Sequence, residues 1–158
     1  MRFVIIGGDA AGMSAASRGK RLDSGMEVIV LEQTSDVSYS ACGMPYNIAD
    51  PDRKINDLIV RSAQVFREKQ NIDLKLGHRV TAIDPKSKTV KGQNLSGEDF
   101  CFPYDKLLIA TGASPVIPDL AGFELPEVMT LKSLEDGRNI KRKIQEVSKV
   151  IILGMGYI

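Results

Sequence analysis

Residues 1–12, MRFVIIGGDAAG, join an apolar run to a glycine turn. The run from Phe3 to Ile6 predicts a buried strand, and small residues at helical spacing from Ala11 to Leu22 predict a helix directly after the turn. This arrangement suits a pyrophosphate, because glycine lets the backbone approach the phosphates and a helix N-terminus offers free N–H groups with a partial positive charge. The chemistry expected at this end of the chain is nucleotide binding.

The turn departs from the G-x-G-x-x-G pattern, since Asp9 replaces the middle glycine and Gly8 is displaced by one position. The alternative is therefore a tight strand-to-helix turn that binds nothing. The context favours nucleotide binding, because a second apolar run from Glu27 to Leu31 completes a βαβ unit. Glu32 then follows Gly12 by 20 positions, where a carboxylate that accepts hydrogen bonds from ribose hydroxyls is expected.

Cys42 lies at the centre of a second segment with chemical potential, SYSACGMPY. Pro45 is typical of the first turn of a helix, which places the thiol near a helix N-terminus, where the dipole favours the nucleophilic thiolate. The alternative is a small buried hydrophobe, as most isolated free cysteines are. Flanking glycine and proline, rather than aliphatic residues, favour the reactive interpretation. Cys101, between two phenylalanines in a short strand, is expected to be a packing or surface residue.

The remaining polar candidates are weaker. His78 is the only histidine and has no companion ligands, so it is expected to be a solvated turn residue, and no metal site is predicted. The basic cluster Arg18, Lys20 and Arg21 is either a solvated helix end or a site that receives the phosphates of an anionic substrate.

Composition limits the function classes. The chain has 158 residues, enough to bury a core, and 21 Lys and Arg against 20 Asp and Glu leave a formal charge of +1. Nothing in this balance favours nucleic-acid or membrane binding. The N-terminus resembles no signal peptide and no apolar run reaches membrane-spanning length, so a cytoplasmic location is expected. Two distant cysteines do not form a disulfide scaffold.

The elements expected between these motifs define an α/β fold. A long irregular connection covers 33–60, and a short helix covers 62–70 with Val65 and Phe66 on its buried side. Closely spaced strand candidates predict an antiparallel meander, and the run YDKLLIATG at 104–112 predicts a further buried strand of the parallel sheet. The meander candidates are 73–76, 79–83, 88–91 and 99–102.

The C-terminal part begins with a proline-rich connector that suggests a domain boundary. A helix is expected over 134–147, with Ser133 and Asp136 in capping-box spacing. The run KVIILGMGYI then predicts a strand that enters Gly154-x-Gly156, the beginning of a second dinucleotide motif. We interpret the chain as an N-terminal fragment of a longer protein.

Taken in order, the motifs GGDAAG, Glu32, SYSACGMPY, YDKLLIATGASPVIP and the second Gly-x-Gly resemble the pyridine nucleotide-disulfide oxidoreductases. The chain most resembles their single-cysteine branch of coenzyme A-disulfide reductases, persulfide reductases, NADH oxidases and NADH peroxidases. The second cysteine of dithiol members is replaced here by Asn47. The resemblance implies an FAD-binding, Rossmann-like doubly wound parallel sheet with a small antiparallel β-meander over 1–114. A connector and the start of an NAD(P)H-binding domain would cover 115–158.

The resemblance also implies residue roles. Cys42 would be the redox cysteine beside the flavin ring. The FAD pyrophosphate would contact Gly7, Gly8, Ala10, Ala11 and Gly12, and the adenosine of FAD would contact Glu32, Gln33 and Val80. The second flavin motif would be Ala110, Thr111 and Gly112.

The other two ligands would bind elsewhere on the chain. NAD(P)H would contact Gly154 and Gly156, and coenzyme A would approach Ser14, Arg18, Arg21, Ser38 and Ala41.

Three functions remain open from the sequence. In the first, electrons pass from NAD(P)H through FAD to Cys42, which reduces a disulfide such as coenzyme A disulfide or a persulfide. In the second, an oxidase or peroxidase cycles Cys42 through sulfenic acid and delivers the electrons to oxygen or peroxide. In the third, the chain is a non-catalytic nucleotide-binding module or an inactive fragment. The full-length enzyme is expected to be a homodimer, and the fragment alone is expected not to turn over.

Overall fold

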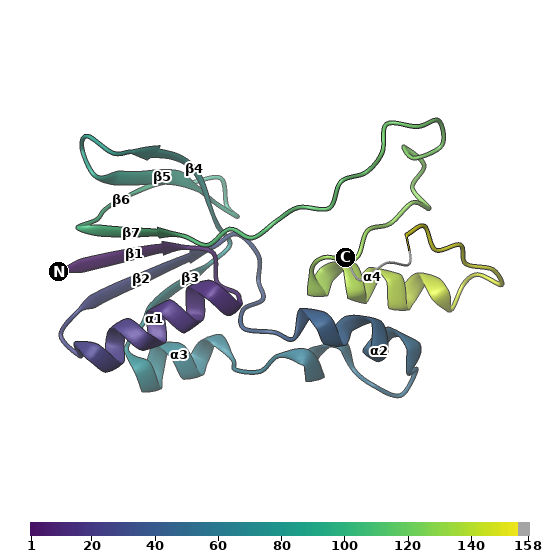
Figure 1. Ribbon diagram of the computed structural model, residues 1–158, viewed down its shortest axis with the longest axis horizontal. Helices are drawn as coiled ribbons and strands as arrows, with labels where there is room; N and C mark the ends of the chain where they lie inside the picture. Colours follow the sequence, from purple (N-terminus) through teal and green to yellow (C-terminus); the bar gives the residue numbers. More distant parts are fainter. Residues whose placement is uncertain (155–158) are drawn as a thin grey trace. The chain divides into compact units, whose positions relative to one another are not determined.

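The computed structural model describes residues 1–154, which divide into two compact units (Figure 1). The first unit contains Met1–Ser40 and Ile59–Ala113, and the second contains Ala41–Leu58 and the chain from Ser114 onward. The glycine turn belongs to the first unit and Cys42 belongs to the second.

A four-stranded parallel sheet forms the centre of the first unit. Its order is β3-β2-β1-β7, and every neighbouring pair is parallel. Val4 and Ile5 on β1 have no exposed surface, as expected for a strand covered on both faces. The strands are β1 (Arg2–Ile6), β2 (Glu27–Glu32), β3 (Asp73–Leu76) and β7 (Lys106–Ile109).

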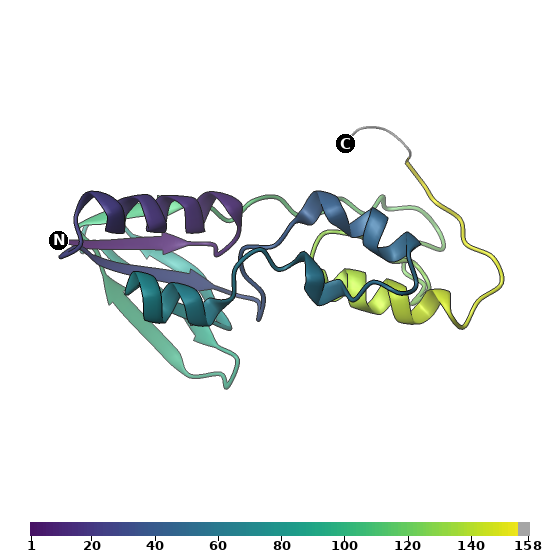
Figure 2. The same ribbon diagram turned by 90° about the horizontal axis from the view of Figure 1, so that it is seen from below.

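Two helices cover one face of this sheet, α1 (Ala10–Leu22) and α3 (Ala63–Gln70) (Figures 1 and 2). Ile5 and Val30 point to this face and pack with Phe66 of α3, which is only 2% exposed. The first βαβ unit, from β1 through α1 to β2, agrees with the sequence prediction. The helix predicted over 62–70 is also confirmed, and the hydroxyl of Ser62 caps it by accepting a hydrogen bond from the Val65 N–H.

A three-stranded antiparallel sheet covers the opposite face. Its strands, in spatial order, are β4 (His78–Asp84), β5 (Thr89–Asn94) and β6 (Asp99–Pro103). Val90 of β5 is completely buried against Val4 and Leu31 of the parallel sheet. The sequence therefore predicted the meander correctly from residue 79 onward.

The prediction was wrong for two neighbouring features. Residues 73–76 do not belong to the meander, because β3 pairs in parallel with β2, with Leu74 opposite Val30. Helix α3 is the crossover that makes this pairing possible, and the chain reverses only afterwards, at Gly77, where φ is +65°. His78 is not a solvated turn residue: it begins β4 half-buried, donates from Nδ1 to the Leu76 carbonyl at 2.7 Å and lies 5.1 Å from the Phe100 ring.

The described part of the second unit, up to residue 154, contains two single-turn 3-10 helices and two α-helices: η1 (Ala41–Gly43), α2 (Met44–Ala49), η2 (Ile55–Leu58) and α4 (Leu134–Ile144). Met44, Ile55 and Leu134 are buried. Gly137 allows close packing, because a Cβ atom there would lie 2.9 Å from Ile55 Cδ1. The predicted capping box is confirmed: the Ser133 hydroxyl accepts from the Asp136 N–H, and the Asp136 carboxylate accepts from the Ser133 N–H.

The apolar run after α4 does not form the predicted strand in its described part. Residues 149–154 are irregular, and Ile151 is 86% exposed. A strand needs a hydrogen-bonding neighbour, and no described strand pairs with this run. Gly156 lies outside the described residues. Within residues 1–154, no helix is long and apolar enough to span a bilayer, and no group of His, Cys, Asp or Glu side chains is arranged to hold a metal ion.

The buried position of β3 leads to the first prediction. Leu74→Ala should lower the free energy of unfolding by about 2–5 kcal/mol, because it opens a cavity against the α3 face of the sheet. The same change at Leu22, which is 68% exposed, should cost less than about 0.5 kcal/mol. Urea denaturation followed by circular dichroism measures both, and equal losses would contradict the placement of β3.

Candidate functional site

The glycine turn, Gly7 to Gly12, is packed too tightly for side chains. Gly7 has a φ of +109°, and a Cβ atom there would overlap the Ala110 carbonyl at the end of β7. A Cβ atom on Gly12 would overlap the Gly7 carbonyl. The Gly7 N–H donates to the Leu31 carbonyl at 2.8 Å, and the Ala110 N–H donates to the Ile6 carbonyl at the same distance. These contacts place the start of α1 against the carboxyl ends of three parallel strands.

The N-terminus of α1 is uncapped by side chains. Asp9 occupies the N-cap position without forming the usual cap hydrogen bond, and the first turn contains no acidic residue. One Asp9 carboxylate oxygen instead accepts a hydrogen bond from the Tyr39 N–H at 3.3 Å. Because the Asp9 carboxylate contacts the loop that contains Tyr39, the N–H groups in the first turn of α1 and the positive end of its dipole are available to bind an anion. A pyrophosphate fits this turn despite the acidic residue in it.

Glu32, at the end of β2, stabilises the glycine turn by a hydrogen bond to its backbone. Its side chain is buried; one carboxylate oxygen accepts from the Gly8 N–H at 2.7 Å, and the other accepts from the N–H and hydroxyl of Thr34 at 2.7 and 2.8 Å. A carboxylate has about four acceptor positions, so about one is left for a ribose hydroxyl. Sequence reasoning missed Thr34, although a hydroxyl two residues after the acid is a local signal.

Several other predicted residues lie on the first unit. Ser38 contacts the glycine turn, since its N–H donates to the Gly8 carbonyl at 3.1 Å, and it has a left-handed φ of +49°. Val80 is next to a β-bulge in β4 and packs on the cluster that contains Leu31. Gln33, Thr111 and Gly112 are exposed.

The basic cluster on α1 separates into two kinds of residue. Lys20 has a structural role, because its ammonium donates to the Ser24 and Met26 carbonyls at 2.8 and 2.9 Å. Ser14, Arg18 and Arg21 are exposed. Their spacing places them along one face of the helix. The two arginines therefore fit a role in binding an anionic ligand better than Lys20 does.

The second unit contains the predicted cysteine segment. Cys42 is exposed and free, in η1 between Ala41 and Gly43, and α2 begins directly afterwards with Pro45 in its first turn. Exposure excludes the alternative of a small buried hydrophobe.

Cys101 is also exposed, as expected for a surface residue. Gly154, with a φ of +85°, belongs to the second unit.

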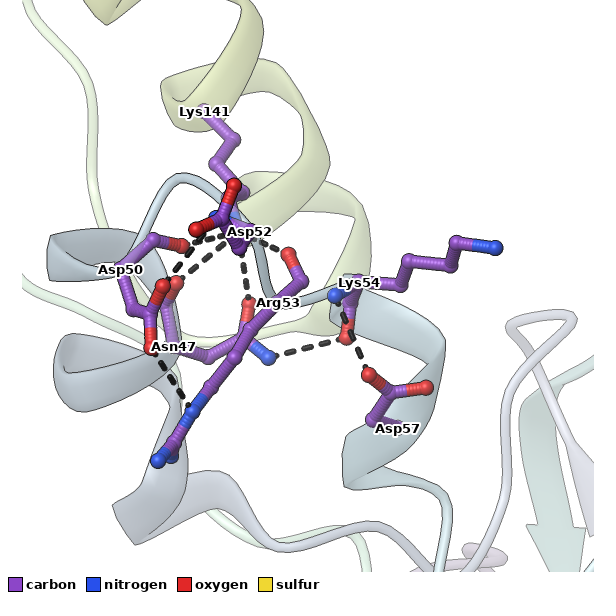
Figure 3. A network of polar contacts seen from close by, with 7 residues as sticks. All are labelled: Asn47, Asp50, Asp52, Arg53, Lys54, Asp57 and Lys141. Carbon is purple, nitrogen blue, oxygen red and sulfur yellow. Dashed lines mark hydrogen bonds and ion pairs between the residues drawn. The ribbon is translucent and has the colours of Figure 1, made fainter.

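Sequence reasoning also missed a polar network next to the cysteine segment (Figure 3). Asn47 of α2 is 1% exposed, and its amide donates to the Lys54 carbonyl at 2.9 Å. The Lys141 ammonium of α4 donates to the carbonyls of Asn47 and Asp50 at 2.9 and 2.8 Å. Lys141 and Asn47 are 94 positions apart, and no local pattern connects them.

Comparison with known proteins gives the family. The family model described as pyridine nucleotide-disulphide oxidoreductase matches residues 1–158. The chain belongs to this family. It is 34% identical over 160 residues to the NADH oxidase of Methanocaldococcus jannaschii, covering 100% of this chain and 36% of the relative. It is 33% identical over 160 residues to the coenzyme A disulfide reductase of Staphylococcus haemolyticus, covering 99% and 36%.

Solved structures show the same fold. The NAD-dependent persulfide reductase of A. fulgidus superposes with a TM-score of 0.87 at 37% identity, covering 92% of this chain and 27% of that one. The match agrees with the predicted α/β fold, a parallel sheet with a small antiparallel sheet. The chain spans about 36% of the length of the two curated relatives named above.

The glycine turn gives a second prediction. Gly12→Ala should lower the free energy of unfolding by about 1–3 kcal/mol, because its methyl group overlaps the Gly7 carbonyl. Gly19→Ala, in the same helix, is the control: its methyl group would meet nothing closer than Met26 Sδ at 3.4 Å, and alanine favours a helix by up to about 1 kcal/mol. Thermal unfolding distinguishes them, and a neutral Gly12→Ala would contradict the tight turn.

Proposed function

We propose that this chain carries the flavin-binding and cysteine-containing part of an NAD(P)H-dependent oxidoreductase that reduces a small-molecule disulfide, such as coenzyme A disulfide or a persulfide. The observation that carries the proposal is the exposed Cys42 in a member of this family whose second thiol position holds the buried Asn47. A lone accessible thiol exchanges with an external disulfide without a neighbouring thiol to close an internal one.

The described residues fit FAD as the cofactor. The uncapped start of α1 supports a pyrophosphate on Gly7, Gly8, Ala10, Ala11 and Gly12. Glu32, with Gln33 and Val80, would meet the adenosine, and Ala110, Thr111 and Gly112 would form the second flavin contact. When bound, FAD supplies two-electron redox chemistry between NAD(P)H and the thiol. Gly154 and Gly156 would begin the NAD(P)H site.

Cys42 is proposed to act as the nucleophile. Its thiolate attacks one sulfur of the substrate disulfide; a new S–S bond forms to Cys42, and the other half leaves as a thiolate with the electron pair of the broken bond. Two electrons, supplied in the overall reaction by NAD(P)H, then break the mixed disulfide. This returns the Cys42 thiolate and releases the second thiolate, which takes up a proton.

The substrate-binding part of the proposal rests on the exposed arginines of α1. Arg18 and Arg21 on α1 would pair with the phosphates of coenzyme A, since a guanidinium binds phosphate oxygens through paired N–H groups. Ser14, on the same helix, and Ser38, in the loop after β2, would line the same substrate, and the family resemblance implies a further contact from Ala41. The longer protein is proposed to be a cytoplasmic homodimer, and sedimentation of the full-length protein tests its oligomeric state.

A second enzymatic function is supported by the relative named NADH oxidase. In that case peroxide would oxidise the Cys42 thiolate to sulfenic acid with release of hydroxide, and two electrons from NADH would reduce the sulfenic acid back to the thiolate with release of water. When oxygen is the acceptor, two further electrons from NADH would first reduce it to peroxide. The two enzymatic functions can be distinguished by supplying the full-length, FAD-loaded protein with NADH and either oxygen or coenzyme A disulfide. Faster NADH oxidation with the disulfide supports the first function, and faster oxidation with oxygen alone supports the second.

The cysteine assignment gives the third prediction. Cys42→Ser in the full-length protein should lower disulfide reduction by at least about 1,000-fold, since a neutral hydroxyl does not replace a thiolate nucleophile. Bound FAD should remain, measured by its absorption spectrum. The matched control is Cys101→Ser, because both cysteines are exposed.

Two outcomes would contradict this assignment. Disulfide reduction retained by Cys42→Ser would reject Cys42 as the nucleophile. A colourless full-length protein that oxidises no NAD(P)H would support the third function, a nucleotide-binding module without chemistry.

A further inference from the structure

We propose that Lys141 is a positioning residue for Cys42, acting through Asn47 and the C-terminal end of α2. This inference rests on the proposed function, because it assigns the network of Figure 3 to the reaction of the cysteine. Lys141 lies on α4, 99 positions after Cys42 in the sequence. Both residues belong to the second unit.

The Lys141 ammonium is surrounded by carbonyl oxygens. It donates to the backbone carbonyls of Asn47, Asp50 and Arg53 and approaches the Asn47 side-chain oxygen at 3.3 Å. These backbone carbonyls belong to the last turn of α2 and the loop after it, where the Asn47 and Asp50 carbonyls accept only long backbone hydrogen bonds, from the Asp50 N–H at 3.3 Å and from the Arg53 N–H at 3.4 Å. A cation at this end also interacts favourably with the helix dipole. The lysine therefore adds short hydrogen bonds at the end of α2, where the backbone hydrogen bonds are long.

Asn47 connects this ammonium to the next part of the loop. Its side-chain oxygen faces Lys141, and its amide donates to the Lys54 carbonyl at 2.9 Å. Lys54 continues the chain of contacts, because its N–H donates to the Asp57 carboxylate in η2 at 3.1 Å. The end of α2 is thus joined to both α4 and η2 (Figure 3).

The cysteine depends on this end of α2 because the helix is short. With six residues, α2 is about 9 Å long at 1.5 Å per residue, and such a helix is not stable alone in water. Its position must come from tertiary contacts. The buried Met44 supplies an apolar contact at the start of α2, and the hydrogen bonds of Lys141 supply a polar contact at its end. Cys42 is attached two residues before Met44, so a shift of α2 shifts the thiol.

The test compares Lys141→Ala with Lys143→Ala in the full-length, FAD-loaded protein. Lys143 is the matched control, because it lies on the same helix and forms only a surface ion pair with Glu146 at 3.1 Å among the contacts described. Lys141→Ala should lower kcat for disulfide reduction by about 10- to 100-fold, the cost of a misplaced reacting group, while the KM for NAD(P)H changes by less than about twofold. Lys143→Ala should keep both values.

Chemical rescue distinguishes positioning from a general loss of folding. The n-propylammonium ion matches the atoms that Lys141→Ala removes and should restore most of the lost kcat. Tetramethylammonium carries the same charge without N–H donors and should restore nothing. Hydrogen exchange in peptides from residues 41–58 provides a readout without turnover: exchange should rise in Lys141→Ala and fall again with n-propylammonium.

Asn47→Leu is the second variant. If the two residues act as one unit, the double variant with Lys141→Ala should lose less than the product of the two single losses. Unchanged kcat in Lys141→Ala, or faster exchange without a loss of kcat, would overturn the positioning role. A wild-type protein without Cys42-dependent disulfide reduction would instead reject the proposed function, and hydrogen exchange would still show whether Lys141 holds the segment.

Discussion

The contact between the glycine turn and the end of β7 is the constraint on which the first unit depends. Gly7 and Gly12 leave no space for a Cβ atom, because the Ala110 and Gly7 carbonyls occupy it. This close approach lets α1 begin directly at the carboxyl ends of the parallel strands. The ends of such strands are where open α/β sheets bind ligands. The backbone geometry of the turn therefore determines both how the sheet packs and where a phosphate fits.

Two acidic residues near this turn have different functions because they contact different groups. Asp9 accepts from the Tyr39 N–H, which connects the turn to the following loop and leaves the helix N–H groups to a ligand. Glu32 is buried and accepts from Gly8 and Thr34, so it supports the turn while one acceptor position remains. Both carboxylates therefore accept hydrogen bonds from backbone N–H groups of the protein.

The second unit depends on a different constraint, the placement of the short helix α2 that follows Cys42. Apolar packing of Met44 and Ile55 against Gly137 supplies burial, and the Lys141 ammonium adds short hydrogen bonds to carbonyls at the end of α2 whose backbone hydrogen bonds are long. The buried amide of Asn47 joins both sides of this arrangement. The exposed Cys42 thus lies shortly before a helix whose other end is hydrogen-bonded to α4.

The sequence by itself determined the features that depend on residues near one another in the chain: the β1-turn-α1 unit, the capping box of Ser133 and Asp136, the place of Cys42 shortly before a helix with Pro45 in its first turn, and the family. Only the tertiary structure decided which sheet β3 joins, how Asp9 is oriented, and which carbonyls Lys141 contacts. It also reversed the expectation for His78, which packs on Phe100. The physical reason is that strand pairing and side-chain hydrogen bonds join residues far apart in sequence, and these partnerships leave no local periodicity or spacing.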